Sequence, residues 1–369
     1  MKKTIGIVNL YSNVDFMGLT KRRPVASVSF LGRYGLIDFA LSNMSNSGID
    51  AIGILIQEKP RSLFKHLKDG HSWNFNSKAG GVSLLYNEKY VNHTKYNNDI
   101  NNLLENISFL ENIPSDYIVI APAHIITTID YNKVVQAHEK SGAEVTMVYK
   151  PILDANISYV GGQILHVKKG EVKAIELNKG VKKAANICLE TYVINTKTLL
   201  QIMRQAKDIS TFFTLKDMFA YVCDERKIHA YEYNGYARCM DSINAYYKYS
   251  LELLNVDVYS QVFSNKWPIY TATNDTPPTK YLKHSDVKKS FVSNGAMIDG
   301  TIENSIIGRN VVIGKGAYIK NCILFNGSKV AGGAVLENVI MDKNAKIEKQ
   351  IKLAGHMDAP LYIQDGDIV

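Results

Sequence analysis

The sequence predicts a two-part protein, in which a doubly wound, mostly parallel α/β domain is followed by a parallel β-helix. Two observations lead to this fold class. Short β-rich runs alternate with amphipathic segments over roughly the first 250 residues, as in parallel sheets covered by helices on both faces. Near the C-terminus, aliphatic residues recur with a period of 17 residues, which helical periodicity does not explain.

The α/β domain, which we assign to residues 1–254, opens with the apolar run Thr4–Leu10. Further buried-strand patterns follow at Ala51–Ile56 and within Tyr117–Ile126, with amphipathic segments between them. Doubly wound sheets bind their ligands outside the carboxyl ends of the strands. We therefore expect a site of the nucleotide-binding kind to begin in the loop after Leu10.

Residues 255–290 contain three prolines and no regular periodicity, so we interpret them as a linker. The predicted β-helix occupies residues 291–369, with its clearest repeats at 302–352. Each repeat carries aliphatic residues at fixed positions and an asparagine near its start: Asn304, Asn321 and Asn338. Such repeats suit stacked coils, and we expect this domain to act as a scaffold and an oligomer interface.

Composition narrows the function classes. The net charge of +8 is spread along the chain, which does not indicate a nucleic-acid partner. The four cysteines form no paired motif, and the apolar runs are too short to cross a membrane, so we expect a cytoplasmic protein without membrane contact. No histidine occurs between Ile302 and Lys352, so we do not expect the acyl transfer that hexapeptide-repeat enzymes perform with a histidine base.

The loop after the first strand reads IVNLYSNVDFMGLTKRRPVAS (Ile7–Ser27) and contains one glycine. Phosphate-binding loops use several glycines, because backbone N–H groups must approach the phosphate oxygens closely. Tyr11 and Phe16 stand among the residues where such glycines would be expected. The loop ends in a basic cluster made of Lys21, Arg22, Arg23 and Arg33. Two interpretations are open. The cluster is dense enough to hold an anionic ligand, or its members are surface charges near a subunit contact.

Two segments carry a resemblance to a known family. GRYGLIDFALSNMSNSGID (Gly32–Asp50) resembles the GKYRIIDFALSN-x-x-NSGI segment of the ADP-glucose pyrophosphorylases, also called glucose-1-phosphate adenylyltransferases. AIGILIQEKPRSLFKHL (Ala51–Leu67) resembles their VGVLTQ-x-x-P-x-SL-x-x-H block. The resemblance covers essentially the whole chain. It implies a Rossmann-like nucleotidyltransferase domain followed by a left-handed parallel β-helix, and a role in glycogen biosynthesis.

The family joins ATP and glucose 1-phosphate with the help of Mg²⁺ held by aspartates. The resemblance places its GDH aspartate on Ala123 or His124, and its second metal-binding aspartate on Cys239. Neither supplies the carboxylate oxygen that Mg²⁺ prefers. We therefore expect no intact catalytic residue and no metal or other cofactor in this chain. Lys179, in IELNKG, resembles the family's sugar-phosphate lysine and would be a residual contact.

RRPVASVSFLGRYGLIDFALSNM (Arg22–Met44) resembles the degenerate, GlgD-type subunit of the family. This resemblance implies a non-catalytic regulatory subunit that joins a catalytic homologue, with Mg²⁺ in that partner, in a hetero-tetramer. A small phosphorylated effector would bind at the basic cluster. The alternative is an active sugar-phosphate nucleotidyltransferase with altered metal ligands, which would be His124 and Asp241.

Overall fold

The computed structural model describes residues 3–12, 14–68, 70–76, 78 and 80–369. The chain forms two compact units, and each is built from segments that are distant in the sequence. Unit 1 comprises Met1–Asn13, Ile37–Cys239 and Trp267–Tyr270. Unit 2 comprises Val14–Leu36, Met240–Lys266 and Thr271–Val369. The described chain has no helix with both the length and the apolar character needed to cross a membrane.

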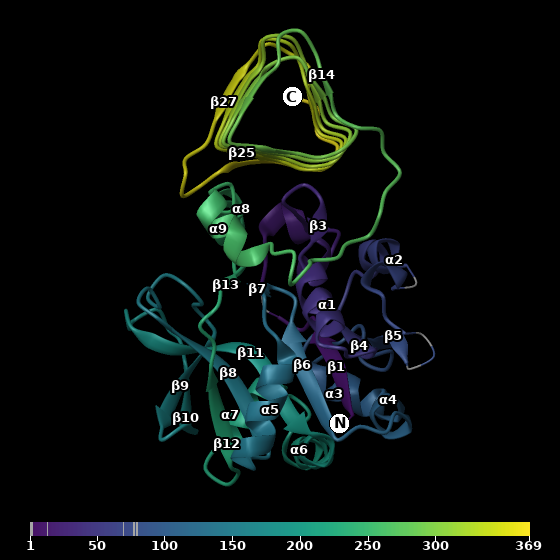
Figure 1. The fold of residues 1–369 in the computed structure, drawn as a ribbon, viewed down its shortest axis with the longest axis vertical. Helices are drawn as coiled ribbons and strands as arrows, with labels where there is room; N and C mark the ends of the chain where they lie inside the picture. The colour runs from purple at the N-terminus through teal and green to yellow at the C-terminus, as the bar shows by residue number, and fades with distance from the viewer. Residues whose placement is uncertain (1–2, 13, 69, 77, 79) are drawn as a thin grey trace. The chain divides into compact units, whose positions relative to one another are not determined.

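Unit 1 is an α/β domain built on a mixed sheet (Figure 1). Its strands lie in the order β5 (Gly81–Tyr86), β4 (Ala51–Ile56), β1 (Thr4–Asn9), β6 (Tyr117–Pro122), β11 (Ala185–Asn195), β8 (Val145–Ile152), β12 (Ile228–Glu232), β10 (Glu171–Leu177) and β9 (Gln163–Lys168). The run from β5 to β6 is parallel, whereas β11 is antiparallel to both of its neighbours in the strand order. The parallel run aligns the carboxyl ends of β1 and β4, where the sequence predicts the site.

Helices connect these strands and cover the sheet. They are α1 (Ile37–Asn46), α2 (Arg61–Leu67), α3 (Asp99–Glu105), α4 (Ile107–Asn112), α5 (Tyr131–Ser141), α6 (Thr196–Ile209) and α7 (Leu215–Val222). Every residue of β4 and β6 is buried, as expected for strands covered on both faces. Helix α6 buries one stripe, made of Leu199, Ile202, Met203 and Ala206, at the spacing of an amphipathic helix.

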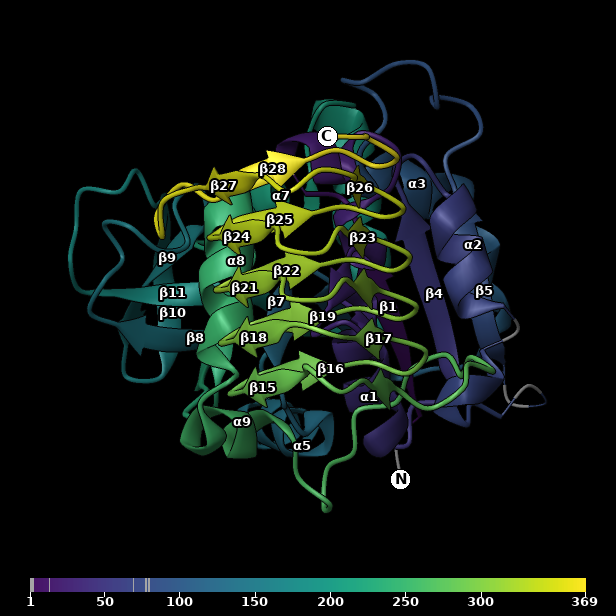
Figure 2. The same ribbon diagram turned by 90° about the horizontal axis from the view of Figure 1, so that it is seen from above.

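Unit 2 contains the left-handed parallel β-helix, whose triangular coils are visible in Figure 1 and whose stacking is visible in Figure 2. Its three parallel sheets run from β14 (Lys280–Tyr281), β15 (Asp286–Lys288) and β16 (Phe291–Val292) to β26 (Lys346–Ile347), β27 (Lys352–Ala354) and β28 (Leu361–Ile363). Thr301 pairs with Tyr318, and Tyr318 with Val335, so successive coils are offset by the 17 residues of the sequence repeat. Aliphatic residues from every coil fill the interior.

The repeating asparagines form a ladder along one corner of the β-helix. Asn304, Asn321 and Asn338 all adopt the left-handed conformation, with φ of +44°, +51° and +53°. Asparagine tolerates this conformation better than most residues, which accounts for its recurrence at these corners. The Nδ2 of Asn304 donates to Oδ1 of Asn321 at 2.7 Å, and Nδ2 of Asn321 donates to Oδ1 of Asn338 at 3.1 Å.

Two further parts of the chain belong to unit 2. The segment expected to be a linker contains helix α9 (Val256–Val262) and the strands β14 and β15, so the β-helix extends back to Lys280. Helix α8 (Ile243–Glu252) packs beside the coils, where the hydroxyl of Tyr247 donates to the backbone oxygen of Asn321 at 2.6 Å. The segment Val14–Leu36, which contains most of the expected phosphate loop, is also part of this unit.

Candidate functional site

Tyr11 lies just beyond the carboxyl end of β1. Its hydroxyl donates to Oδ1 of Asn97 at 2.7 Å and accepts from Nδ2 of Asn102 at 3.0 Å. Burial raises the pKa of this phenol well above its ordinary value, so the hydroxyl stays neutral. A hydrogen-bonded aromatic ring thus stands where a phosphate loop would present backbone N–H groups.

The next part of the expected phosphate loop packs within unit 2. Phe16 and Leu19 are fully buried, and the ring centroids of Phe16 and Tyr246 lie 5.5 Å apart. A Cβ added to Gly18 would lie 2.1 Å from the ring of Tyr362, so the loop's one glycine permits a close approach to the β-helix. These residues therefore serve packing.

The basic cluster does not act as one group. The guanidinium of Arg23 is buried, forms an ion pair with Asp342 of the β-helix, and donates from Nε to the backbone oxygen of Leu19 at 2.7 Å. The hydroxyl of Tyr362 also donates to Asp342, at 2.9 Å. The charge of Arg23 is therefore neutralised within the protein by Asp342, whereas Lys21, Arg22 and Arg33 are exposed.

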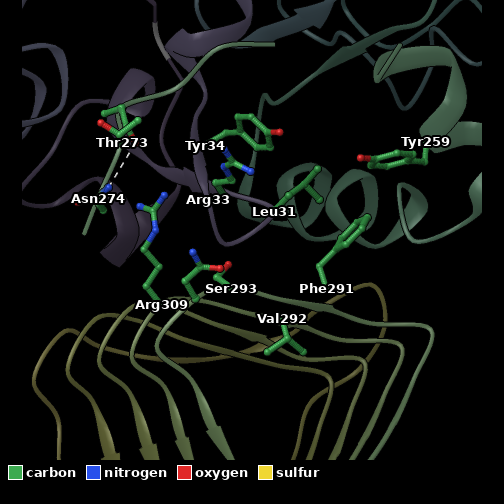
Figure 3. Close-up of a pocket in the computed structure, with 12 residues that line it drawn as sticks. Leu31, Arg33, Tyr34, Tyr259, Thr273, Asn274, Phe291, Val292, Ser293 and Arg309 are labelled. Carbon is green, nitrogen blue, oxygen red and sulfur yellow. Dashed lines mark hydrogen bonds between the residues drawn. The ribbon is translucent and has the colours of Figure 1, made fainter. Parts of the chain in front are cut away.

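Arg33 lines a cavity of about 320 Å³ within unit 2, which we call the arginine pocket. Figure 3 shows that Arg33 and Arg309 both extend into it, Arg33 from the loop between β2 (Ser29–Phe30) and β3 (Tyr34–Gly35) and Arg309 from a turn of the β-helix. Of the described residues that line it, none is acidic. They are Leu31, Arg33, Tyr34, Tyr259, Ala272, Thr273, Asn274, Phe291, Val292, Ser293, Asn294 and Arg309. Sequence reasoning missed Arg309, because no motif marks it.

The two positions that resemble the family's metal-binding aspartates lie close together. Strand β7 (Ile125–Thr127), which directly follows His124, pairs with β13 (Ala237–Cys239), and Cys239 is the register partner of Ile125. Ala123, His124 and Cys239 are all buried. The fold thus brings both positions together, but with a methyl group, an imidazole and a thiol in place of carboxylates.

A carboxylate that the motifs did not reveal lies beside His124. Glu190 has an Oε2 3.7 Å from Nε2 of His124 and an Oε1 2.5 Å from Nζ of Lys216. It sits at an irregularity of β11 between Cys188 and Thr191, where its own φ of +51° turns the side chain out of the regular strand alternation. No sequence motif marks either Glu190 or Lys216.

His124, Glu190 and Lys216 form a triad of neighbouring titratable groups whose charges compensate one another. Burial alone would raise the pKa of Glu190, but its neighbours hold that pKa below its ordinary value, so the carboxylate is charged. Burial lowers the pKa of His124, which favours the neutral imidazole. Burial opposes the charge of Lys216, yet the attraction of Glu190 raises its pKa. The result is a partly buried ion pair beside a neutral histidine.

These residues do not fit a Mg²⁺ site. Mg²⁺ prefers oxygen ligands, and the oxygen donor in the triad, Glu190, is already paired with an ammonium group. Within the described part of the chain, no group of three or more histidine, cysteine, aspartate or glutamate side chains could hold a metal ion. Asp241, a metal ligand only in the alternative of an active enzyme, belongs to unit 2 and accepts from the hydroxyl of Ser242 at 3.1 Å.

A second cavity, of about 480 Å³, lies within unit 1 and is called here the sheet pocket. Tyr11 and Gln57, which follow β1 and β4, place it at the expected edge of the sheet. Lys179 is exposed and does not line it, whereas Glu176 and Leu177 do. The other lining residues are Ser12, Thr94, Lys95, Asn97, Asn98, Asp99, Gly161, Gln163, Ile175, Phe212, Thr214, Lys216, Asp217 and Ala220.

Asp99 lies in the wall of the sheet pocket and is buried. It accepts from Nδ2 of Asn9 at 2.9 Å and from the backbone N–H of Leu215 at 3.0 Å, which joins α3 to α7. Burial raises the pKa of its carboxyl above the ordinary value. Asp99 therefore holds the pocket wall together with hydrogen bonds that are already made.

Comparison with known proteins identifies relatives for both parts of the chain. The nucleotidyl transferase family model matches residues 15–249, and the GlmU-like, C-terminal hexapeptide model matches residues 277–359. The glycogen biosynthesis protein GlgD of Bacillus subtilis (strain 168) is 32% identical over 350 residues, which cover 94% of this chain and 91% of that protein. A glucose-1-phosphate adenylyltransferase of Mycoplasma mobile is 31% identical, with 82% of this chain and 80% of that protein covered. One from Clostridium perfringens (strain SM101 / Type A) is 28% identical, covering 85% and 81%.

Proposed function

Because this chain belongs to the glucose-1-phosphate adenylyltransferase family, with a role in glycogen biosynthesis, we propose that it is a non-catalytic, regulatory subunit. It joins a catalytic homologue in a cytoplasmic hetero-tetramer and promotes the synthesis of ADP-glucose from ATP and glucose 1-phosphate. Mg²⁺ is bound by the catalytic partner.

The observation that carries this proposal is the ion pair between Glu190 and Lys216 beside His124. Nucleotidyl transfer needs a metal ion to neutralise the charge on the phosphates, and that ion needs free carboxylate oxygens. Here the nearby carboxylate is paired with a lysine, and the positions that resemble the metal-binding aspartates are Ala123 or His124, and Cys239. The hydrogen-bonded ring of Tyr11 also occupies the loop where phosphates would be held.

A subunit without chemistry of its own can raise a partner's activity only by binding the active conformation more tightly than the inactive one. An intact fold therefore has to be kept while the catalytic groups are lost. The regular β-helix and the buried pair between Arg23 and Asp342 support a folded scaffold of this kind.

We also propose that a small phosphorylated effector binds in the arginine pocket. Arg33 and Arg309 bring two positive charges into one cavity, and guanidinium groups suit phosphate geometry. Lys21 and Arg22 are exposed on the same segment as Arg33 but do not line the pocket. Arg23 is not part of this proposal, because its charge is paired with Asp342.

The test is pyrophosphate release from ATP and glucose 1-phosphate with Mg²⁺, measured for this chain, for a catalytic homologue, and for the two mixed. We expect no turnover by this chain alone and a higher rate for the mixture than for the homologue. Turnover by this chain alone that is lost in His124→Ala or Asp241→Asn would support the alternative, an active enzyme with altered ligands.

A further inference from the structure

Strand β9 has one edge that is not paired along most of its length. It is the last strand in the order of the large sheet, at the opposite side of unit 1 from β5 (Figure 1). It pairs with β10 from Gln163 to Lys168, but it meets β11 at a single register pair, Ile164 with Ile187. Beyond that pair, residues 165–168 have no partner strand on this side among the described residues. Such an edge is a template for pairing with another extended chain.

A groove with a cavity of about 480 Å³ runs along this edge, and we call it the edge groove. It is lined by residues 164–167 of β9, by residues 184–186 at the start of β11 and by residues 151–153 at the end of β8. The start of β11 pairs with β8, but β11 reaches β9 only at Ile187 and β6 only from Tyr192 onward. The groove therefore lies between two strand edges, neither of which is paired there within the described chain.

The rim of the edge groove exposes large apolar side chains on loops that are held by hydrogen bonds. Leu153 lines the groove and is 84% exposed, and Val181, on the loop between β10 and β11, is 81% exposed. The buried side chain of Asn178 donates from Nδ2 to the backbone oxygen of Ala155 at 2.9 Å. The backbone N–H of Ala155 donates in turn to the backbone oxygen of Lys183 at 2.8 Å. Large aliphatic side chains that fixed loops hold in water indicate an interaction surface.

The surface around the edge groove is positively charged. The stretch from Lys168 to Lys183 contains six lysines and two glutamates. Both glutamates are already paired with lysines of the same stretch. The remaining lysines are exposed and form no ion pair within the described part of the chain: Lys168, Lys169, Lys179 and Lys183. A partner that covers this surface should therefore carry negative charge.

We propose that the edge groove binds an extended, acidic segment of a partner protein, which adds to β9 as a further strand. Leu165 and Val167 share one face of β9, and His166 and Lys168 share the other. Residues directly opposite each other on neighbouring strands share a face, so the added strand would place apolar residues beside Leu165 and Val167 and an acidic residue beside Lys168. The recognised segment therefore alternates apolar and acidic residues. The inference goes beyond the proposed regulatory function, which does not require a partner at β9.

The test is fluorescence anisotropy of a rhodamine-labelled hexapeptide, Val-Glu-Val-Glu-Val-Glu, titrated with the full-length chain at low ionic strength. We expect saturable binding of this peptide and much weaker binding of the equally labelled Val-Lys-Val-Lys-Val-Lys. Methylation of every backbone nitrogen in the acidic peptide should abolish binding, because the peptide then has no N–H group to donate to the backbone of β9.

Two variants of the chain test the position of the peptide. Lys168→Glu and Leu153→Ser should each weaken binding of the acidic peptide by about fivefold or more, the first by reversing a charge and the second by removing apolar contact. Both residues are exposed, so neither change should disturb the fold. Lys207→Glu, at an exposed position of α6, is the matched control, because it changes the net charge equally and should leave the affinity unchanged.

The inference is overturned if the acidic peptide does not bind, if the lysine peptide binds as tightly, if the methylated peptide keeps its affinity, or if both groove variants bind like the wild type. It is also overturned if another occupant is found. Self-association in analytical ultracentrifugation that Leu153→Ser abolishes would identify a second copy of this chain, and co-sedimentation with phosphatidylserine vesicles that Lys168→Glu abolishes would identify a lipid surface. Because the peptide is titrated into this chain alone, its binding is independent of the stimulation of a catalytic partner.

Discussion

The ammonium group of Lys216 lies 2.5 Å from a carboxylate oxygen of Glu190, on the other side of which lies the imidazole of His124. This ion pair sits beside the position that resembles a metal-binding aspartate. It engages Oε1 of this carboxylate with a cation of the protein itself. Under the proposed function, this pair holds the fold together and takes no part in chemistry.

Removing Lys216 should destabilise the fold. Lys216→Met leaves the largely buried carboxylate of Glu190 without its cation, which should lower the free energy of unfolding by about 1–3 kcal/mol. Urea unfolding followed by circular dichroism measures this change. The matched control is Lys182→Met, which breaks a more exposed pair with Glu176 and should have a much smaller effect. Equal effects of the two changes would show that the pair between Glu190 and Lys216 contributes no more to stability than an exposed pair.

The buried neutral histidine should make stability depend on pH. Burial lowers the pKa of His124 in the folded state, so the unfolded chain binds the proton more readily. Stability should therefore be lost as the pH falls below the unfolded histidine value of about 6.5. Thermal unfolding between pH 7.5 and 5.5 should show a smaller loss for His124→Asn than for the wild type. His356→Asn, at an exposed histidine, should follow the wild type, and an identical profile for both variants would contradict this account.

Arg23 should be a structural residue. Arg23→Met leaves the buried Asp342 uncompensated, and we expect a loss of about 3–5 kcal/mol in the free energy of unfolding. Arg22→Met changes an exposed neighbour and should cost less than about 0.5 kcal/mol. Chemical unfolding of both variants tests the contrast. A small effect at Arg23 would return that residue to the set of candidate effector ligands.

The arginine pocket should bind phosphate through two residues that are far apart in the sequence. Arg33→Met and Arg309→Met should each weaken the binding of inorganic phosphate by about fivefold or more, because each removes a charge-assisted hydrogen-bond donor. Isothermal titration calorimetry at low ionic strength measures the affinity. Arg22→Met serves as the control, since it removes the same charge without touching the pocket lining. If neither pocket variant changes the affinity, phosphate does not bind there.

Features that repeat along the sequence could be predicted from it. The period of 17 residues indicates an inward-facing position that recurs in each coil. The asparagines Asn304, Asn321 and Asn338 indicate a left-handed corner that recurs in the same way. The alternation of strands and helices could also be predicted, because the spacing of apolar residues along each segment indicates which of its faces is buried. The scarcity of glycine in the loop after β1 could be read directly from the sequence, and it predicts that this loop does not hold a phosphate.

The candidate site could be predicted only in part. The motifs located Ala123, His124 and Cys239, but Glu190 joins them through an irregularity in β11 and Lys216 through the start of α7, and neither has a local signature. The basic cluster was visible, yet the fold pairs Arg23 with Asp342 of the β-helix and places Arg33 beside Arg309. Such pairings arise from tertiary structure and leave no pattern in one sequence.

The most direct test of the central claim is pyrophosphate release by this chain mixed with a catalytic homologue whose own metal-binding aspartates have been changed to asparagine. Both subunits are then present and assembled, so any turnover must come from this chain. A rate indistinguishable from the uncatalysed background, together with stimulation of the unmodified homologue, is the result that the account predicts. Turnover by the mixture with the inactivated homologue would contradict it, because it would show that the site around His124, Glu190 and Lys216 carries out the chemistry itself.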